Sequence, residues 1–146
     1  MNAQPEINTE IRRWIEKAEH DLRNAEYVLT LKEECPTDTV SFHSQQCAEK
    51  YLKALLVWHG IVFPKTHDLV ALFNLVPSNC GLLLRMEEVS PLNRYSVEAR
   101  YPGDWDIIDV REATDAVKMA QRVREAVRSV LPTTILCVDS YGQNLV

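Results

Sequence analysis

Apolar residues near the start of the chain recur at steps of three and four, which is the spacing of one face of a helix. The pattern predicts a helix over about residues 9–32, with Asn8 or Thr9 as the capping residue and Glu10 at the positive end of the helix dipole. We expect it to stop near Cys35 and Pro36. Its apolar positions are Ile11, Trp14, Ile15, Ala18, Leu22, Ala25 and Leu29.

The next apolar segment is hydrophobic on nearly all sides. It predicts a helix that starts from a cap at Thr37 or Asp38 and ends at Gly60, since glycine readily adopts the left-handed conformation that closes a helix. A helix of this kind is either central in a bundle or covered on a second side by a partner chain. Between residues 48 and 58 the only polar positions are Glu49, Lys50 and Lys53.

Two shorter stretches follow. Thr66 as cap, Asp68 in the first turn and Pro77 just beyond the end predict a helix of two to three turns. Residues 79–94 have a helical pattern that Pro91 interrupts, because proline lacks a backbone donor.

A long closing helix is the last regular element. From Asp109 to Pro132 apolar residues return with a spacing of 3.5 residues. The segment before it, YSVEARYPGDWDII, shows no sustained period and indicates a structured loop. Residues 133–146 include β-branched residues but have no partner strand elsewhere, so we expect a tail that is flexible or bound to a partner.

Helices with one apolar stripe each bury those stripes most simply in a bundle. The sequence therefore predicts an all-α fold, an up-and-down bundle of four to five helices with a short additional helix. We expect one domain over residues 9–132, followed by the tail. A chain of 146 residues with 46% hydrophobic residues suits a single core.

Composition narrows the classes of function. A net charge of -5 argues against the broad basic surface that duplex nucleic acid requires. We see no membrane-spanning run, no secretion signal, no glycine-rich phosphate loop and no C-x-x-C pair. We therefore expect a cytoplasmic protein with reduced cysteines and without a metal or cofactor.

Three stretches together resemble the HEPN family, which is named for nucleotide-binding domains shared by higher eukaryotes and prokaryotes. They are WIEKAEHDLRNAEYVL, then SFHSQQCAEKYLKALLVWHGI followed by KTHDL, and YSVEARYP before the last helix. The resemblance covers about residues 12–131. It implies a helical homodimer, commonly encoded beside a minimal nucleotidyltransferase in systems that behave as toxin and antitoxin, with RNA or nucleotide as the ligand.

The resemblance also implies an enzymatic option. Many family members are metal-independent ribonucleases in which an arginine is followed, after four to six residues, by a histidine near the start of the last long helix. Arg100 matches the arginine position, but the residues that follow, YPGDWDI, contain no histidine. Arg94 lacks one as well, and the formal match of Arg13 with His20 lies on the first predicted helix, away from the family's site. The catalytic pair is incomplete.

Arg100, with Tyr101 and Pro102, is our candidate for binding phosphate, because a guanidinium offers two parallel hydrogen bonds to phosphate oxygens. Tyr95 and Glu98 belong to the same string and could orient that arginine. The structural alternatives are that Tyr95 packs in the core and that Arg100 pairs with a nearby carboxylate, from Glu98, Asp104 or Asp106, to fix the loop.

Other residues have weaker claims. Asp104 or Asp106 would need strong tuning to replace the missing histidine as a base. Trp105 lies beside Arg100 and could stack on a base, whereas Trp14 and Trp58 follow apolar faces and should be buried. A polar stripe of His43, Gln46 and Lys50 favours a solvated face or a helix-to-helix network over an RNA contact. At the start of the third helix, His67 is better suited to bonding a carbonyl than to holding a metal.

Three hypotheses follow for the function. The first is a homodimeric binding subunit that docks a nucleotidyltransferase and holds nucleotide or RNA near Arg100. The second is a ribonuclease that uses Arg100 with an unconventional second residue. The third is an interaction scaffold without a ligand.

Overall fold

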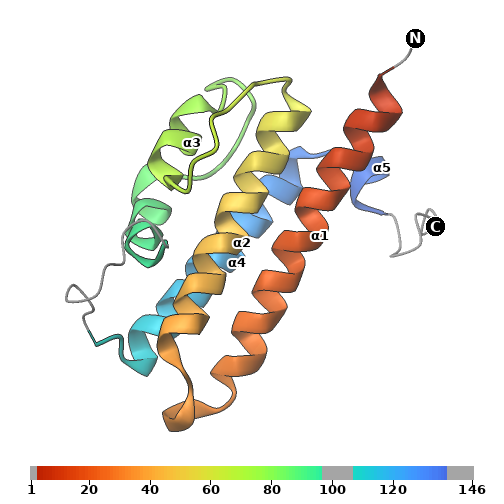
Figure 1. The fold of residues 1–146 in the computed structure, drawn as a ribbon. Helices are drawn as coiled ribbons and strands as arrows, with labels where there is room; N and C mark the ends of the chain where they lie inside the picture. The colour runs from red at the N-terminus through yellow and green to blue at the C-terminus, as the bar shows by residue number, and fades with distance from the viewer. Residues whose placement is uncertain (1–2, 97–106, 138–146) are drawn as a thin grey trace.

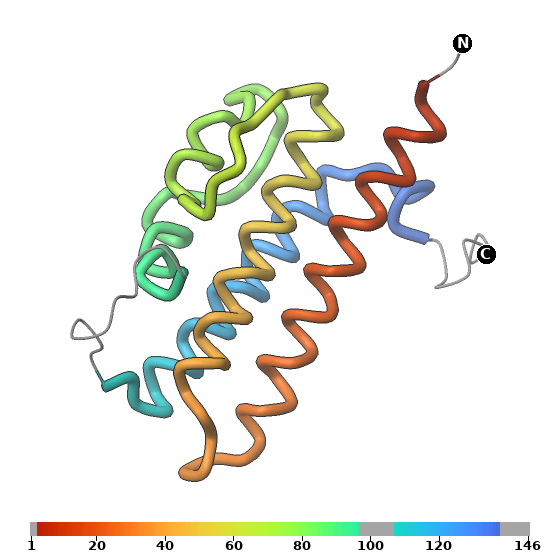
Figure 2. The backbone as a smooth tube through the Cα atoms, in the orientation of Figure 1, coloured from red at the N-terminus to blue at the C-terminus, as the bar shows by residue number. Residues whose placement is uncertain are grey.

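The computed structural model describes residues 3–96 and 107–137, and these residues form an all-α bundle (Figure 1). Its long helices are α1 (Gln4–Leu29), α2 (Thr37–Trp58) and α4 (Val110–Val130). Helix α2 runs back along α1, the segment after α2 returns the chain along the bundle, and α4 then runs in the same direction as α2 (Figure 2). This is the predicted up-and-down arrangement, and no strand occurs in the described ranges.

The first helix begins upstream of its predicted start at residue 9. Pro5 stands in the first turn, where its missing amide costs no helical bond, and Ile7 already packs against the core. The predicted caps at Asn8 and Thr9 were therefore wrong, and the Thr9 hydroxyl instead donates back to the Pro5 carbonyl at 2.9 Å. The helix ends at Leu29, before the predicted residue 32, and a single 3-10 turn, η1 (Lys32–Glu34), leads to Cys35.

Helix α2 is the central element, which explains its apolar character on all sides. It contacts α1, α4, α3 (Leu69–Leu75) and η3 (Ser90–Tyr95) within one chain. The expected closure at Gly60 is confirmed by its positive φ of 68°. The predicted caps at Thr37 and Asp38 were both wrong, because both residues lie inside α2, which follows Pro36 without a side-chain cap. The Thr37 hydroxyl instead donates to the Ile108 carbonyl at 2.6 Å, which attaches the start of α2 to the residues just before α4.

The return segment is less helical than its pattern predicted. Asp68, not Thr66, caps α3, and its carboxylate accepts from the amides of Val70 and Ala71. The helix predicted over residues 79–94 was wrong. Gly81 has a φ of 82°, and the only helical turns there are two short 3-10 helices, η2 (Met86–Glu88) and η3, with Pro91 in the first turn of η3.

The closing helix α4 begins where predicted. The Asp109 side chain accepts from the Glu112 amide at 2.7 Å. Beyond Pro132 the first residues of the predicted tail form a short helix, α5 (Thr133–Leu136), in which Ile135 is buried. Arg12 of α1 donates to the carbonyls of Thr134 and Ile135, so this turn is attached to α1.

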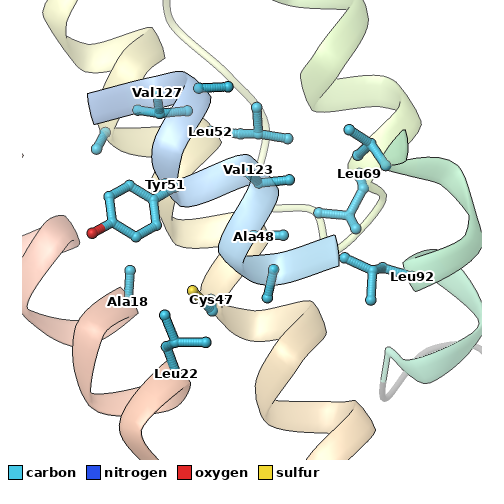
Figure 3. Packing of buried hydrophobic residues seen from close by; sticks show 14 of the residues in the cluster. Ala18, Leu22, Cys47, Ala48, Tyr51, Leu52, Leu69, Leu92, Val123 and Val127 are labelled. Carbon is cyan, nitrogen blue, oxygen red and sulfur yellow. The ribbon is translucent and has the colours of Figure 1, made fainter. Parts of the chain in front are cut away.

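Side chains from every major element meet around α2 (Figure 3). They include Ala18 and Leu22 of α1, Leu69 of α3 and Val123 of α4. Small residues on α1 and α4 let these helices approach α2 closely, and the larger leucines of α2 fill the space between them. None of the helices in the described part is long and apolar enough to cross a membrane.

A cluster of ion pairs joins α1 to α4 beside this core. The Arg124 Nε donates to both carboxylate oxygens of Glu19 at 3.0 Å, and Arg128 lies 3.4 Å from the same carboxylate. Partial burial alone would raise the pKa of Glu19, but hydrogen bonding and charge from Arg124 outweigh it, and the pKa stays below its ordinary value. The carboxylate is therefore charged at neutral pH.

The central position of α2 predicts that two leucines contribute very differently to the free energy of unfolding. Leu52 is fully buried, whereas Leu83 is 76% exposed. Replacing Leu52 by alanine should lower the free energy of unfolding by about 2–5 kcal/mol, because it leaves a cavity in the core. Urea unfolding followed by circular dichroism measures this, with Leu83→Ala as the matched control. Equal losses from the two variants would contradict the fold.

Candidate functional site

Most of the residues predicted to bind a ligand lie outside the described residues. These are Glu98, Arg100, Tyr101 and Trp105, together with Pro102, Asp104 and Asp106, all within residues 97–106. Tyr95 is the one predicted site residue whose surroundings the structure describes. It ends η3 just before this segment, and Glu112 stands on α4 shortly after it.

A contact between Tyr95 and Glu112 joins η3 to α4, the described elements before and after those residues. The Tyr95 hydroxyl donates to Glu112 Oε1 at 2.6 Å, and Arg94 Nη1 donates to the same oxygen at 2.6 Å. The Arg94 guanidinium also lies over the Tyr95 ring, 5.4 Å from its centre. Tyr95 is only 5% exposed, so the alternative of core packing holds for this residue, whereas an orienting contact with Arg100 stays a prediction.

Burial and the neighbouring carboxylate both act on the Tyr95 phenol. Burial, the hydrogen bond to Glu112 and the negative charge of that carboxylate together raise the pKa of Tyr95 well above 10. The phenol is therefore a stable hydrogen-bond donor at neutral pH and holds Glu112 in place.

A pocket of about 270 Å³ opens beside this contact, between η3 and α4. Its walls combine apolar side chains with two carboxylates and one guanidinium. The lining residues are Pro91, Arg94, Tyr95, Glu112, Asp115, Ala116 and Met119. The pocket has room for a small planar group.

The other sequence candidates do not assemble into a site. Arg13 and His20 are both exposed on α1, two turns and about 10 Å apart along the helix axis. Trp14 and Trp58 are partly buried and pack against the core, as predicted. The described residues contain no group of three or more histidine, cysteine or acidic side chains that could hold a metal.

Two residues of the polar stripe on α2, His43 and Lys50, form a helix-to-helix network, which was one of the two alternatives that the sequence favoured. Asp21 of α1 lies 2.8 Å from His43 Nδ1 and also pairs with Lys50. Gln46 turns inward and donates to Gln45 Oε1 at 2.6 Å. The stripe therefore serves contacts within the bundle.

A buried ionic network on α2 was missed by the sequence reasoning. Glu49 is only 2% exposed. Its carboxylate accepts a hydrogen bond from Lys53 Nζ at 3.1 Å and lies 2.9 Å from His67 Nδ1. Gln45 bridges it to the His67 carbonyl. Lys53 Nζ also lies 5.4 Å from the centre of the Trp14 ring. The available signal was two opposite charges four residues apart in an otherwise apolar helix.

Comparison with known proteins places this bundle in a family. The HEPN domain model matches residues 11–130, so the chain belongs to the HEPN domain family. The chain is also similar to MJ1304 of Methanocaldococcus jannaschii, a protein named as a toxin candidate. The two are 31% identical over 134 residues, which span 81% of this chain and 86% of the relative.

Two crystal structures share the fold. TT1696 from Thermus thermophilus superposes with a TM-score of 0.67 at 27% identity, covering 90% of this chain and 100% of that one. ST0689, described as an archaeal HEPN homologue, gives a TM-score of 0.62 at 26% identity, covering 82% of this chain and 95% of the other. These likenesses confirm the resemblance drawn from the three sequence stretches and the all-α fold.

The Tyr95 hydroxyl gives a direct test of the contact between η3 and α4. Tyr95→Phe should cost about 1–3 kcal/mol of folding stability, because it removes a buried hydrogen bond to a carboxylate. Tyr27→Phe, at a tyrosine that is 76% exposed, is the matched control. Since the folded-state pKa of Tyr95 is raised, its phenol stabilises the fold below pH 10, and the difference between wild type and variant should shrink as the pH rises above that value. Urea unfolding measured across that range would show both effects, and a constant difference would contradict them.

The Glu49 network makes a separate prediction. Glu49→Gln should lower the free energy of unfolding by about 3–5 kcal/mol, because it leaves the Lys53 ammonium buried without its counter-charge. Glu16→Gln, at an exposed position of α1, should leave the unfolding midpoint unchanged. Thermal unfolding compares the two, and similar midpoints would show that Glu49 does not carry a buried charge.

Proposed function

We propose that this chain is the HEPN subunit of a toxin–antitoxin-type system and that it binds the phosphate of RNA or a nucleotide near Arg100. Membership of the HEPN domain family and the likeness to a toxin candidate support the type of system. In this proposal the chain acts in the cytoplasm as a homodimer and docks a minimal nucleotidyltransferase. Because elements of the same chain cover α2 on all sides, its apolar character is no argument for a dimer. The homodimer therefore rests on the family resemblance alone.

One observation carries the ligand-binding part of the proposal. The hydrogen bond from Tyr95 to Glu112 joins η3, which precedes residues 97–106 in the chain, to α4, which follows them, and a pocket opens beside this contact. Arg100 stands in that segment, and a guanidinium is suited to phosphate because its planar donors match two phosphate oxygens. The overall charge of -5 means that such a site acts locally and does not depend on a basic surface.

Binding is favoured over cleavage for a chemical reason. Ribonuclease chemistry needs a group that takes and gives a proton near neutral pH, and no histidine follows Arg100 within the family's spacing. Tyr95 cannot take that role as a base, because its raised pKa keeps the phenol protonated. The chain's own residues therefore supply recognition of phosphate without an evident proton-transfer pair.

Substitution of Arg100 tests this function. Calorimetric titration of the purified chain with a short single-stranded RNA and with nucleoside monophosphates should show binding. Arg100→Ala should weaken it at least about tenfold, because it removes a charge-assisted bidentate contact. The matched control is Arg13→Ala, which removes an exposed arginine from α1 and with it the other formal ribonuclease match.

The same samples separate the alternatives. RNA cleavage that disappears in Arg100→Ala, with the fold intact, would favour the ribonuclease. Absence of both binding and cleavage would favour a scaffold without a ligand. Either result would overturn the proposed binding role.

A further inference from the structure

The pocket between η3 and α4 has one hydrogen-bonding group with no described role. Glu112, Asp115, Ala116 and Met119 follow one another at helical spacings, so they share a face of α4 that forms one wall. The opposite wall is made by Pro91 and the Arg94–Tyr95 pair of η3. Because Tyr95 is only 5% exposed and lies under the Arg94 guanidinium, the surface that this wall offers to a flat ring is the guanidinium and the Pro91 ring.

The two carboxylates of the pocket differ in what they already bind. Glu112 Oε1 accepts hydrogen bonds from both the Tyr95 hydroxyl and the Arg94 guanidinium, so this carboxylate already links η3 to α4. Asp115 forms no hydrogen bond or ion pair with another residue of the described ranges. Its negative charge contributes to the raised pKa of Tyr95. The acceptor capacity of the pocket is therefore concentrated on Asp115.

We infer that this pocket binds a guanine base and that Asp115 reads its Watson–Crick edge. This inference rests on the proposed function, since the base would belong to the nucleotide or RNA whose phosphate meets Arg100. Asp115 is then a specificity-determining residue. The space of about 270 Å³ lies near the lower limit of roughly 300 Å³ for small-ligand sites and suits one base better than a whole nucleotide.

The choice of guanine follows from donor and acceptor patterns. Guanine presents N1–H and the 2-amino group side by side, and these two donors match the two oxygens of a carboxylate. Adenine and cytosine each place a ring nitrogen acceptor beside the amino group, which would face the negative charge of Asp115. Uracil offers a single N–H between two carbonyls. A carboxylate therefore binds the Watson–Crick edge of guanine through two hydrogen bonds, whereas each of the other three bases places at least one acceptor atom against the negative charge.

The apolar residues of the pocket complete the argument. Met119 and Pro91 offer soft and flat surfaces for a ring, and Ala116 leaves space beside Asp115. Glu112 and the Tyr95 ring hold the Arg94 guanidinium in place, so the stacking surface is already formed without the ligand.

Three nucleotides test the inference. Calorimetric titration of the full chain with GMP, IMP and AMP should give the tightest binding for GMP. IMP, which lacks the 2-amino group, should bind about tenfold more weakly, since one of the two donors to Asp115 is missing. AMP should bind at least as weakly as IMP. Equal dissociation constants for GMP and AMP would overturn the guanine assignment and leave phosphate binding at Arg100 standing.

Asp115→Asn tests the residue itself. It should remove the preference for GMP over AMP by weakening GMP, while AMP binding stays the same or improves because the repulsive charge is gone. Asp38→Asn, an exposed aspartate on α2, is the matched control and should keep the preference. Asp115 is exposed, so the variant should fold, which circular dichroism verifies.

Failure of the two proposals can be told apart. If Arg100→Ala weakens all three nucleotides but Asp115→Asn leaves the GMP preference unchanged, the assignment of Asp115 is overturned and the proposed function survives. If none of the three nucleotides and no RNA binds to the wild-type chain, the proposed function and the guanine site fail together.

Discussion

Burial of α2 on all sides is the constraint on which the rest of the structure depends. A helix whose C-terminal half carries so few polar groups can be stable only when other elements cover each of its faces. Helices α1 and α4 cover two of them, and the return segment with α3 and η3 covers a third. The up-and-down order of the chain follows, because each of these elements must pass along α2.

The polar residues near the core fix the alignment of the helices. Apolar packing alone tolerates small shifts between helices, whereas a buried charge has to meet its partner. Glu49 holds Lys53 and the connector residue His67 together, and Glu19 joins α1 to Arg124 of α4. These contacts set the position of the connector after α2 and the position of α4 relative to α1.

The pocket between η3 and α4 depends on the irregular fold of residues 79–96. A single long helix over residues 79–94 would have lain along α2 and presented different side chains to α4. Two 3-10 helices instead bring Tyr95 to Glu112, so that an aromatic ring and two carboxylates line one hollow. The shape of this pocket therefore depends on how residues 79–96 fold.

The sequence by itself determined the helical class, the apolar character of α2, the start of the closing helix at Asp109 and the family resemblance, because periodicity and short motifs depend on neighbouring residues. It did not determine where α1 begins, since Ile7 packs against core residues from other elements, or how residues 79–94 fold, where Gly81 takes a positive φ. The contact of Tyr95 with Glu112 and the network around Glu49 were decided only by tertiary structure, because their members come from separate elements. Hydrophobic spacing indicates which face of a helix is buried, but it does not indicate which polar group of a neighbouring helix will contact that face.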